Sequence, residues 1–112
     1  MDKNNYLGTF EEMVLLSVYR LGNAAYGVPI RQEVERLSGR DVSVGALYTA
    51  LDRLEQKGYI KSRQGEATPE RGGRAKKYFR VEGSGVQALE EMQRVHARML
   101  LGNGLVQKGG AA

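Results

Sequence analysis

The segment from Ser43 to Gly58 constrains the fold more strongly than any other part of the chain. Ser43 is a residue type that favours a helix N-cap, and Gly58 is typical of the left-handed position that ends a helix. Between them, apolar side chains recur at the spacing of one helix face: Val44, Leu47, Tyr48, Leu51 and Leu54. The opposite face carries small and polar residues: Gly45, Thr49, Asp52, Arg53 and Gln56. The pattern predicts a helix with one face in a core and the other in solvent.

Another helix is predicted near the N-terminus. Thr9 followed by Glu12 is typical of a capping box, in which both side chains satisfy free backbone amides at a helix start. We expect this helix to reach about Leu21, with Gly22 and Asn23 ending it. Its residues are apolar around most of the circumference, which suits a helix that is buried against several partners.

A second, short helix is predicted before the segment at Ser43. Pro29 fits its first position, because proline lacks the amide hydrogen that would be unpaired there. Ile30, Val34 and Leu37 follow at helical spacing, and Gly39 is placed to end the helix. Because only a tight connection separates the second helix from the third, the two form a candidate helix-turn-helix.

The periodicity changes after the third helix. β-Branched and aromatic residues are frequent in two short runs, 59–63 and 77–81, which flank a polar stretch with Pro69, Gly72 and Gly73. This arrangement predicts a β-hairpin with a long, basic and flexible tip.

A fourth helix is expected after the hairpin. Ser84 is its candidate N-cap, and helical spacing continues for about 17 residues, or about 25 Å. The residues that carry this spacing are Val86, Leu89, Met92, Val95, His96, Met99 and Leu100. The last segment, 102–112, contains four glycines and is predicted to be a flexible tail.

These elements predict a mainly helical fold with one small β-hairpin. Three helices followed by a hairpin describe a winged helix-turn-helix, here residues 1–83. Residues 84–101 add a C-terminal helix to the same compact unit. A length of 112 residues fits a single domain.

The composition argues against several classes of function. The chain has no cysteine and one histidine, His96, so it offers neither a thiolate nucleophile nor a Cys-based or paired-His metal site. Without paired carboxylates on facing elements either, we expect no enzyme, no metal and no cofactor. The longest uncharged apolar run, 13–19, is far shorter than the roughly 20 residues of a membrane span. The N-terminus lacks the pattern of a secretory signal, so we expect a cytoplasmic protein.

Basic charge is concentrated in and around the hairpin. The chain has a net charge of +4 and a pI near 9.5. Between Lys57 and Arg80 there are eight Lys or Arg but only two acidic residues, Glu66 and Glu70. This stretch therefore carries +6 and the rest of the chain −2. A local excess of cations favours a polyanionic partner such as double-stranded DNA.

Several motifs resemble those of the PadR family of transcriptional regulators. The string SGRDVSVGALYTALDRLEQKGYI is similar to that family's recognition helix, which begins near V-S-x-G-x-L-Y and continues L-x-R-L-E-x-K-G. GGRAKKYFRV resembles its R-x-Y-Y-x-L strand after the wing, while MVLLSVYRLG and AYGVPI resemble its first helix and its G-Y-E-I element. Two motifs differ: the aromatic pair of the last strand is Tyr78-Phe79, and VEGSG at 81–85 replaces L-T-x-x-G.

The resemblance implies a regulator that binds DNA as a dimer. Similar proteins are mostly repressors, and some release DNA when an aromatic or cationic small molecule binds. The single helix after the wing matches a short subgroup in which this helix makes the dimer. We therefore expect a homodimeric repressor of a pseudo-palindromic operator, and the existence of an effector stays open. The alternative is a winged helix that binds only proteins, against which the basic hairpin argues.

The third helix is the candidate recognition helix, because the major groove admits one helix and residues near its N-terminus reach base edges. The candidate DNA contacts on it are Ser43, Gly45, Tyr48, Thr49 and Arg53. Tyr48 is included mainly because of the resemblance. Three alternatives stay open: capping alone for Ser43, a packing requirement for Gly45, and a surface ion pair for Arg53. In the hairpin, the residues expected to neutralise phosphates are Arg71, Arg74, Lys76 and Lys77.

An excess of apolar side chains predicts a dimer interface. A helix after the wing lies at the margin of the domain, where the other helices cover only one of its sides. A monomer would then expose an apolar patch, which is uncommon in proteins that stay monomeric. The expected interface residues are Val86, Leu89, Met92, Val95, His96, Met99 and Leu100. For His96, a ligand-binding or pH-sensing role is the alternative.

Overall fold

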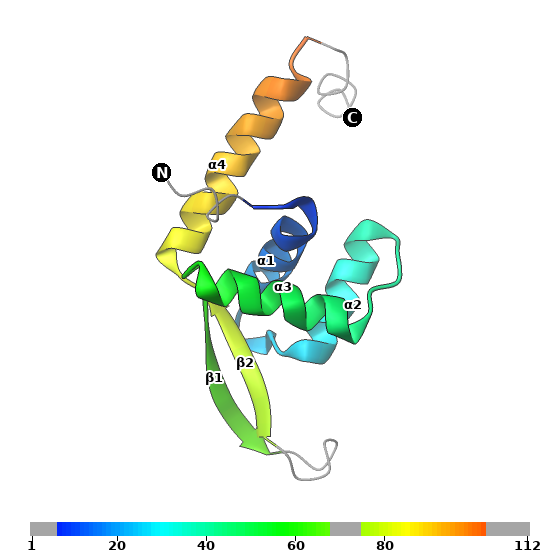
Figure 1. Ribbon diagram of the computed structural model, residues 1–112, viewed down its shortest axis with the longest axis vertical. Helices are drawn as coiled ribbons and strands as arrows, with labels where there is room; N and C mark the ends of the chain where they lie inside the picture. Colours follow the sequence, from blue (N-terminus) through cyan, green and yellow to red (C-terminus); the bar gives the residue numbers. More distant parts are fainter. Residues whose placement is uncertain (1–6, 68–74, 103–112) are drawn as a thin grey trace.

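The structure is a computed structural model, and it describes residues 7–67 and 75–102. These residues form four α-helices, one short 3-10 helix and a two-stranded hairpin (Figure 1). The elements in chain order are α1 (Thr9–Leu21), η2 (Gly22–Ala24), α2 (Gly27–Ser38), α3 (Val44–Gln56), β1 (Ile60–Ala67), β2 (Ala75–Val81) and α4 (Gly83–Leu100). α1, α2 and α3 form a bundle, from which the hairpin and α4 extend in opposite directions. The predicted winged helix-turn-helix with a C-terminal helix is confirmed.

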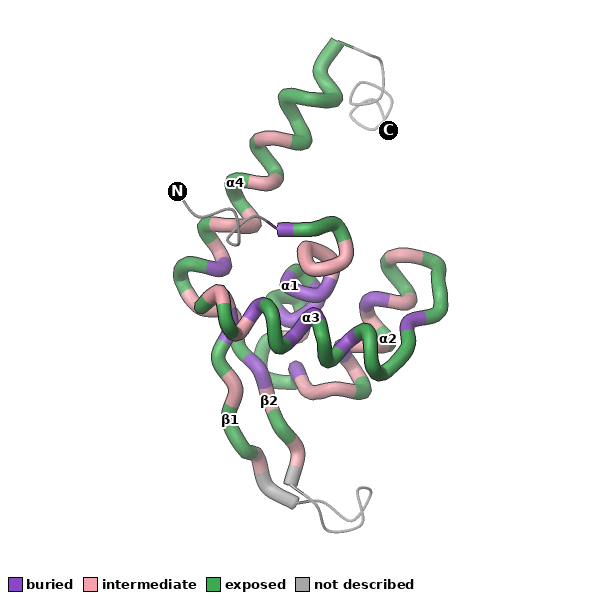
Figure 2. Tube along the Cα trace, in the orientation of Figure 1, coloured by how far each residue is buried: buried purple, intermediate pink, exposed green. Residues whose placement is uncertain are grey.

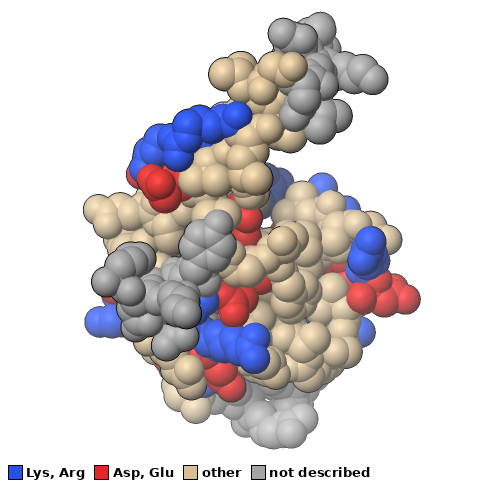
Figure 3. Space-filling model, turned by 45° about the horizontal axis from the view of Figure 1, so that its top comes forward, with Lys and Arg blue, Asp and Glu red and all other residues tan. Residues whose placement is uncertain are grey.

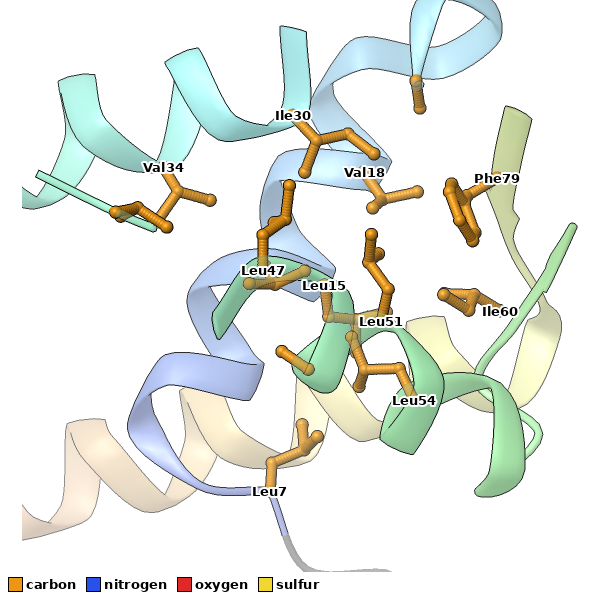
Figure 4. Packing of buried hydrophobic residues seen from close by; sticks show 14 residues of the cluster. Leu7, Leu15, Val18, Ile30, Val34, Leu47, Leu51, Leu54, Ile60 and Phe79 are labelled. Carbon is orange, nitrogen blue, oxygen red and sulfur yellow. The ribbon is translucent and has the colours of Figure 1, made fainter. Parts of the chain in front are cut away.

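One hydrophobic core joins the three-helix bundle to the root of the hairpin (Figure 4). Side chains from α1, α2, α3 and both strands point into it, each at most 3% exposed: Leu15, Val18, Ile30, Val34, Leu47, Leu51, Leu54, Ile60 and Phe79. Figure 2 shows that burial is concentrated in these elements and that the outer half of α4 is exposed. The core therefore holds the bundle and the hairpin as one unit.

The ends of the helices agree with the predicted caps at three positions. Ser43 caps α3, since its hydroxyl oxygen accepts a hydrogen bond from the Ala46 amide at 3.0 Å. Gly39 and Gly58 follow α2 and α3 with φ of 72° and 81°, in the left-handed region that favours glycine.

Three helix starts were predicted wrongly. α1 begins after Gly8, whose carbonyl accepts from the Glu12 amide at 2.9 Å, so Thr9 is already helical and forms no capping box. The buried side chain of Leu7 anchors the chain just before this start. α2 begins directly after the extended residue Tyr26, which makes Pro29 its third residue rather than its first.

The start of α4 also differs from the prediction. Its N-cap is Glu82, and Ser84 lies within the first turn. Ser84 does not cap the helix, because its hydroxyl donates a hydrogen bond to the carbonyl of Gly58 at 2.7 Å. This bond, together with one from the Glu82 amide to the Tyr59 carbonyl at 2.8 Å, ties the start of α4 to the loop between α3 and β1.

Two side chains of α2 fix the connection to α3. The Arg31 Nε donates to the carbonyl of Val42 at 2.5 Å, and the Glu35 carboxylate accepts from the Val42 amide at 2.8 Å. The side chain of Val42 is itself buried. The amide and the carbonyl of Val42 are therefore both hydrogen-bonded to side chains of α2. These bonds hold the connection between α2 and α3 in place.

The hairpin is attached to the bundle through backbone contacts that the sequence did not predict. The Phe79 amide donates to the carbonyl of Ala25 at 2.8 Å, and Tyr26 forms an antiparallel bridge with Tyr78. The segment just before α2 thus acts as a short third strand beside β2. The predicted hairpin tip with Pro69, Gly72 and Gly73 lies outside the described residues.

Only the first part of α4 packs on the rest of the domain. Ala88, Leu89 and Met92 are partly buried against the core, whereas Met99 is 72% exposed and Leu101 is 73% exposed. The predicted tail, apart from Gly102, lies outside the described residues. None of the described helices is both long enough and apolar enough to span a membrane.

We expect Gly85→Ala to destabilise the fold and Gly83→Ala to leave it intact. A Cβ at Gly85 would overlap the Tyr59 carbonyl oxygen and lie 2.8 Å from Cγ1 of Val81, so α4 would have to move away from the hairpin root. Overpacking of this kind costs about 1–3 kcal/mol. A Cβ at Gly83 meets nothing within 4 Å. Urea unfolding of both variants measures the difference, and equal stabilities would contradict this close approach.

Candidate nucleic-acid interface

The outward face of α3 is free of covering elements in the described part of the chain. Gly45, Thr49 and Asp52 are exposed along its centre. On the side toward α2, Val44 and Tyr48 line a groove of about 280 Å³. On the side toward the start of α1, Ala46 and Arg53 line a shallower depression. The N-terminal end of this face therefore carries small side chains. In a helix bound in the major groove, this end comes closest to the bases.

The structure bears on one of the two explanations offered for Gly45, a packing requirement within the chain. A Cβ built on Gly45 meets no described atom within 4 Å, and Gly45 has no positive φ that would require glycine. Packing within the chain therefore does not explain this glycine. Ser43 is the N-cap and is also exposed, so capping and contact with a partner are compatible.

Tyr48 connects α3 to the start of α2. Its ring crosses the groove so that the hydroxyl lies over Gly27, where a Cβ would overlap it. The side chain is 37% exposed, so Tyr48 belongs to the surface rather than to the predicted buried stripe. Val44 also departs from that prediction, because the groove separates it from α2 and leaves it 54% exposed.

A cluster of rings and cations continues this surface onto the hairpin. The rings of Tyr26 and Tyr78 lie 5.3 Å apart. The ammonium of Lys76 lies 4.3 Å from the centre of the Tyr26 ring, and the guanidinium of Arg63 lies 4.8 Å from that of Tyr78. Such cation–ring contacts orient long side chains without removing their charge. Tyr26, Tyr78 and Arg63 were not predicted as site residues, because this cluster depends on pairing between segments far apart in the sequence.

The cations at the root of the hairpin have acidic partners. Lys57 pairs with Glu11 at 2.6 Å, while Arg80 and Lys61 lie 3.1 and 4.0 Å from Glu82. By contrast, no ion pair joins Arg63, Lys76 or Lys77 to an acidic residue whose side chain the structure describes, a set that does not include Glu66 of β1. Lys77 lies on the other face of the hairpin, 5.6 Å from the Phe79 ring. The predicted contacts Arg71 and Arg74 fall outside the described residues.

Arg53 stands at the far end of the α3 face. Its side chain is 64% exposed and its guanidinium lies 3.9 Å from the Glu11 carboxylate, which is held more closely by Lys57. The expected surface pairing of Arg53 was with Asp52, Glu55 or Gln56 on its own helix, and the acidic group found beside it is instead Glu11 of α1. At this distance and exposure the pair is weak, and it leaves the guanidinium accessible.

Other charges belong to the scaffold. The Arg36 and Arg20 guanidinium groups donate hydrogen bonds to Glu33, each as close as 2.7 Å, and lower the pKa of that carboxyl to about 2. On the face shown in Figure 3, blue and red side chains lie next to one another in several places. The charges of Arg20, Arg36 and Glu33 therefore compensate one another locally.

The predicted interface residues on α4 fall into two groups. Leu89 and Met92 pack partly against the core of their own chain, and Val86 and Leu89 line a groove of about 210 Å³ beside Leu16 and Tyr19 of α1. Further along the helix, Val95 is half-buried, and the remaining predicted residues are exposed: His96, Met99 and Leu100. The His96 Nε2 lies 3.6 Å from the Glu12 carboxylate. The first helix was expected to pack against the fourth in the dimer, but Leu16 and Tyr19 were not named as interface residues, because that helix was expected to be buried on most sides.

Within the described residues, no group of three or more His, Cys, Asp or Glu side chains is arranged to hold a metal ion. The exposed surface instead offers hydroxyls, the single glycine Gly45 of α3 and cations. This chemistry suits a large anionic partner better than a small reacting substrate.

Solved structures with the same fold are regulators by their descriptions. A PadR-like transcription factor from Bacteroides fragilis is 25% identical and matches with a TM-score of 0.71, over 90% of this chain and 89% of that chain. A PadR-like transcriptional regulator from Bacillus cereus is 23% identical, with a TM-score of 0.69 over 89% of this chain and 93% of that one. No curated protein is significantly similar to this chain in sequence.

A family model agrees with the structural matches. The model described as "Transcriptional regulator PadR-like family" matches residues 15–91, which include the helix-turn-helix, the hairpin and the first half of α4. Because this match spans more than half of the 112 residues, the chain belongs to the PadR-like family of transcriptional regulators.

Proposed function

We propose that this regulator binds double-stranded DNA with the outward face of α3 in the major groove and the hairpin on the adjacent backbone. The observation that carries the proposal is Gly45, an exposed glycine inside a helix that nothing in the described chain requires. Glycine costs a helix roughly 0.5–1 kcal/mol relative to alanine. A sugar-phosphate strand that approaches α3 closely at this position would leave no room for a side chain, which explains why glycine occurs there despite the cost to the helix.

The neighbouring groups suit this arrangement. The hydroxyls of Ser43 and Thr49 are exposed near the N-terminus of α3, where phosphates and base edges are reached. The hydroxyl of Tyr48 lies over Gly27, the residue after Tyr26, and the paired rings of Tyr26 and Tyr78 carry the positive charge of Lys76 and Arg63. Because these cations have no described acidic partner, they are available to neutralise phosphates.

The proposal includes a homodimer formed through α1 and α4. Leu16 and Tyr19 of α1 are 40% and 55% exposed beside the groove to α4, and Leu101 at the end of α4 is 73% exposed. A second copy of the chain, placed across a two-fold axis, would cover both helices. Two recognition helices about 34 Å apart would then require a pseudo-palindromic operator. Repression follows where such an operator overlaps a promoter.

Gly45→Ala tests the close approach directly. We expect the variant to be as stable as the wild type or up to roughly 1 kcal/mol more stable, because alanine favours the helix and meets no neighbour. We expect its affinity for duplex DNA, selected by the wild type from a random library, to fall at least about tenfold, or 1.4 kcal/mol. Thermal unfolding and fluorescence anisotropy give the two values. Unchanged affinity would remove Gly45 from the interface.

The hairpin cations determine the salt dependence of binding. Replacing Arg71, Arg74, Lys76 and Lys77 with Ala should flatten the log–log plot of affinity against salt by about 0.9 for each phosphate that is no longer neutralised. A double variant of Arg94 and Arg98 on α4 removes charge away from the proposed DNA-binding face and serves as the control, with sedimentation to verify that it stays a dimer. Equal slopes for the wild type and the quadruple variant would exclude the hairpin from DNA binding.

Leu16→Glu should break the dimer, whereas Leu37→Glu should not. The two leucines are matched in exposure, 40% and 41%, but Leu16 lies beside the α1–α4 groove and Leu37 lies on α2. A charge buried in an interface without a partner is costly, while a charge on a solvent-exposed face is not. Sedimentation of the wild type and both variants checks this. A wild-type protein that is monomeric at micromolar concentration would contradict the proposed dimer. A Leu16→Glu variant that stays dimeric would contradict the proposed position of the interface.

A further inference from the structure

We propose that Val44 contacts the 5-methyl groups of thymine in the major groove, so that this regulator recognises thymine within each half-site. The inference rests on the proposed binding of α3 to DNA and adds the base that it recognises. It assigns a role to a residue that the sequence had placed in the core.

The position of Val44 is unusual for a valine. It is 54% exposed in the first turn of α3, and Val28, in the first turn of α2, is 52% exposed. Both side chains line the same groove, with Tyr48 between the two helices. Single exposed apolar residues are common, but two at neighbouring helix starts form a local apolar surface.

The groups around Val44 limit which bases α3 recognises. From Val44 to Leu51 the helix has no Arg, Lys, Asn or Gln, the side chains that make bidentate bonds to guanine or adenine. Only Tyr48 and Thr49 carry a hydroxyl there, and that of Tyr48 lies over Gly27. What the first two turns offer outward is mainly methyl groups, from Val44, Ala46 and Thr49. Thymine alone among the four bases presents a methyl group in the major groove.

The surroundings favour DNA over a protein as the occupant of this surface. Val44 adjoins the exposed Ser43 and Gly45, and the groove ends at Gly27, next in the chain to Tyr26, whose ring contacts Lys76 and Tyr78. An apolar patch beside cations is complementary to DNA, in which a base methyl group lies beside phosphates. A protein that bound this surface would have to present acidic side chains around an apolar centre of its own.

Deoxyuridine substitution tests the contact, because uracil differs from thymine only by the missing methyl group. The probe is a duplex that the full-length wild type selects from a random library, with each thymine replaced by deoxyuridine in turn. Loss of a buried methyl, worth about 0.8 kcal/mol, weakens binding about fourfold. We expect this loss at one or two positions in each half-site and at no flanking position.

Variants assign the effect to a residue. Val44→Ala should bind the thymine duplex more weakly and show less than a twofold difference between the thymine and deoxyuridine duplexes. Leu37→Ala, a change of a similarly exposed side chain on α2 outside the groove, should keep the full difference. A difference that persists in Val44→Ala would overturn the role of Val44.

The remaining outcomes separate this inference from the proposed function. Wild-type protein that binds the selected duplex equally well with deoxyuridine at every position contradicts thymine recognition and leaves DNA binding intact. Wild-type protein that enriches no duplex contradicts both, and capture of a protein partner through Val28 and Val44 would then replace them.

Discussion

The burial of one face of α3 determines what the rest of the molecule can do. Leu47, Leu51 and Leu54 lie fully inside the core between α1, α2 and the hairpin root, at 1% exposure or less. A helix held by one face must present the opposite face to solvent, so Gly45 and Thr49 point outward as a consequence of packing. Because the leucines fix rotation and depth, the outward face is rigid before any partner arrives, which lowers the entropic cost of binding.

The hairpin is positioned by the same core rather than by a flexible hinge. Ile60 and Phe79 bury the roots of both strands, and the Phe79 amide bonds to Ala25 just before α2. The described part of the hairpin, with Arg63 and Lys76, is therefore held in one position relative to α3. α4 starts from this root as well, since Glu82 bonds to Tyr59 and Gly85 packs against it. A dimer formed through α4 would thus set the spacing between two recognition helices through rigid connections.

Local chemistry explains which features could be predicted from the sequence. The cap at Ser43, the left-handed glycines 39 and 58, and the leucine stripe depend on residues within one or two turns, and each was predicted correctly. The features that were missed depend on distant segments. The Tyr26–Tyr78 cluster requires β2 to pair with the chain before α2, and the start of α1 depends on where Leu7 is buried. Periodicity alone also placed Val44 in the core, because it does not show where a groove opens between two helices.

The central claim is that a two-fold symmetric pair of α3 helices binds DNA, and selection from a random duplex library tests it most directly. The account predicts enriched sites that are pseudo-palindromic, with half-sites about one helical turn apart. It also predicts that each half-site contains thymine at the base pairs that the first turn of α3 contacts. Enriched sites without two-fold symmetry would contradict the dimeric arrangement, and the absence of any enriched site would contradict the account as a whole.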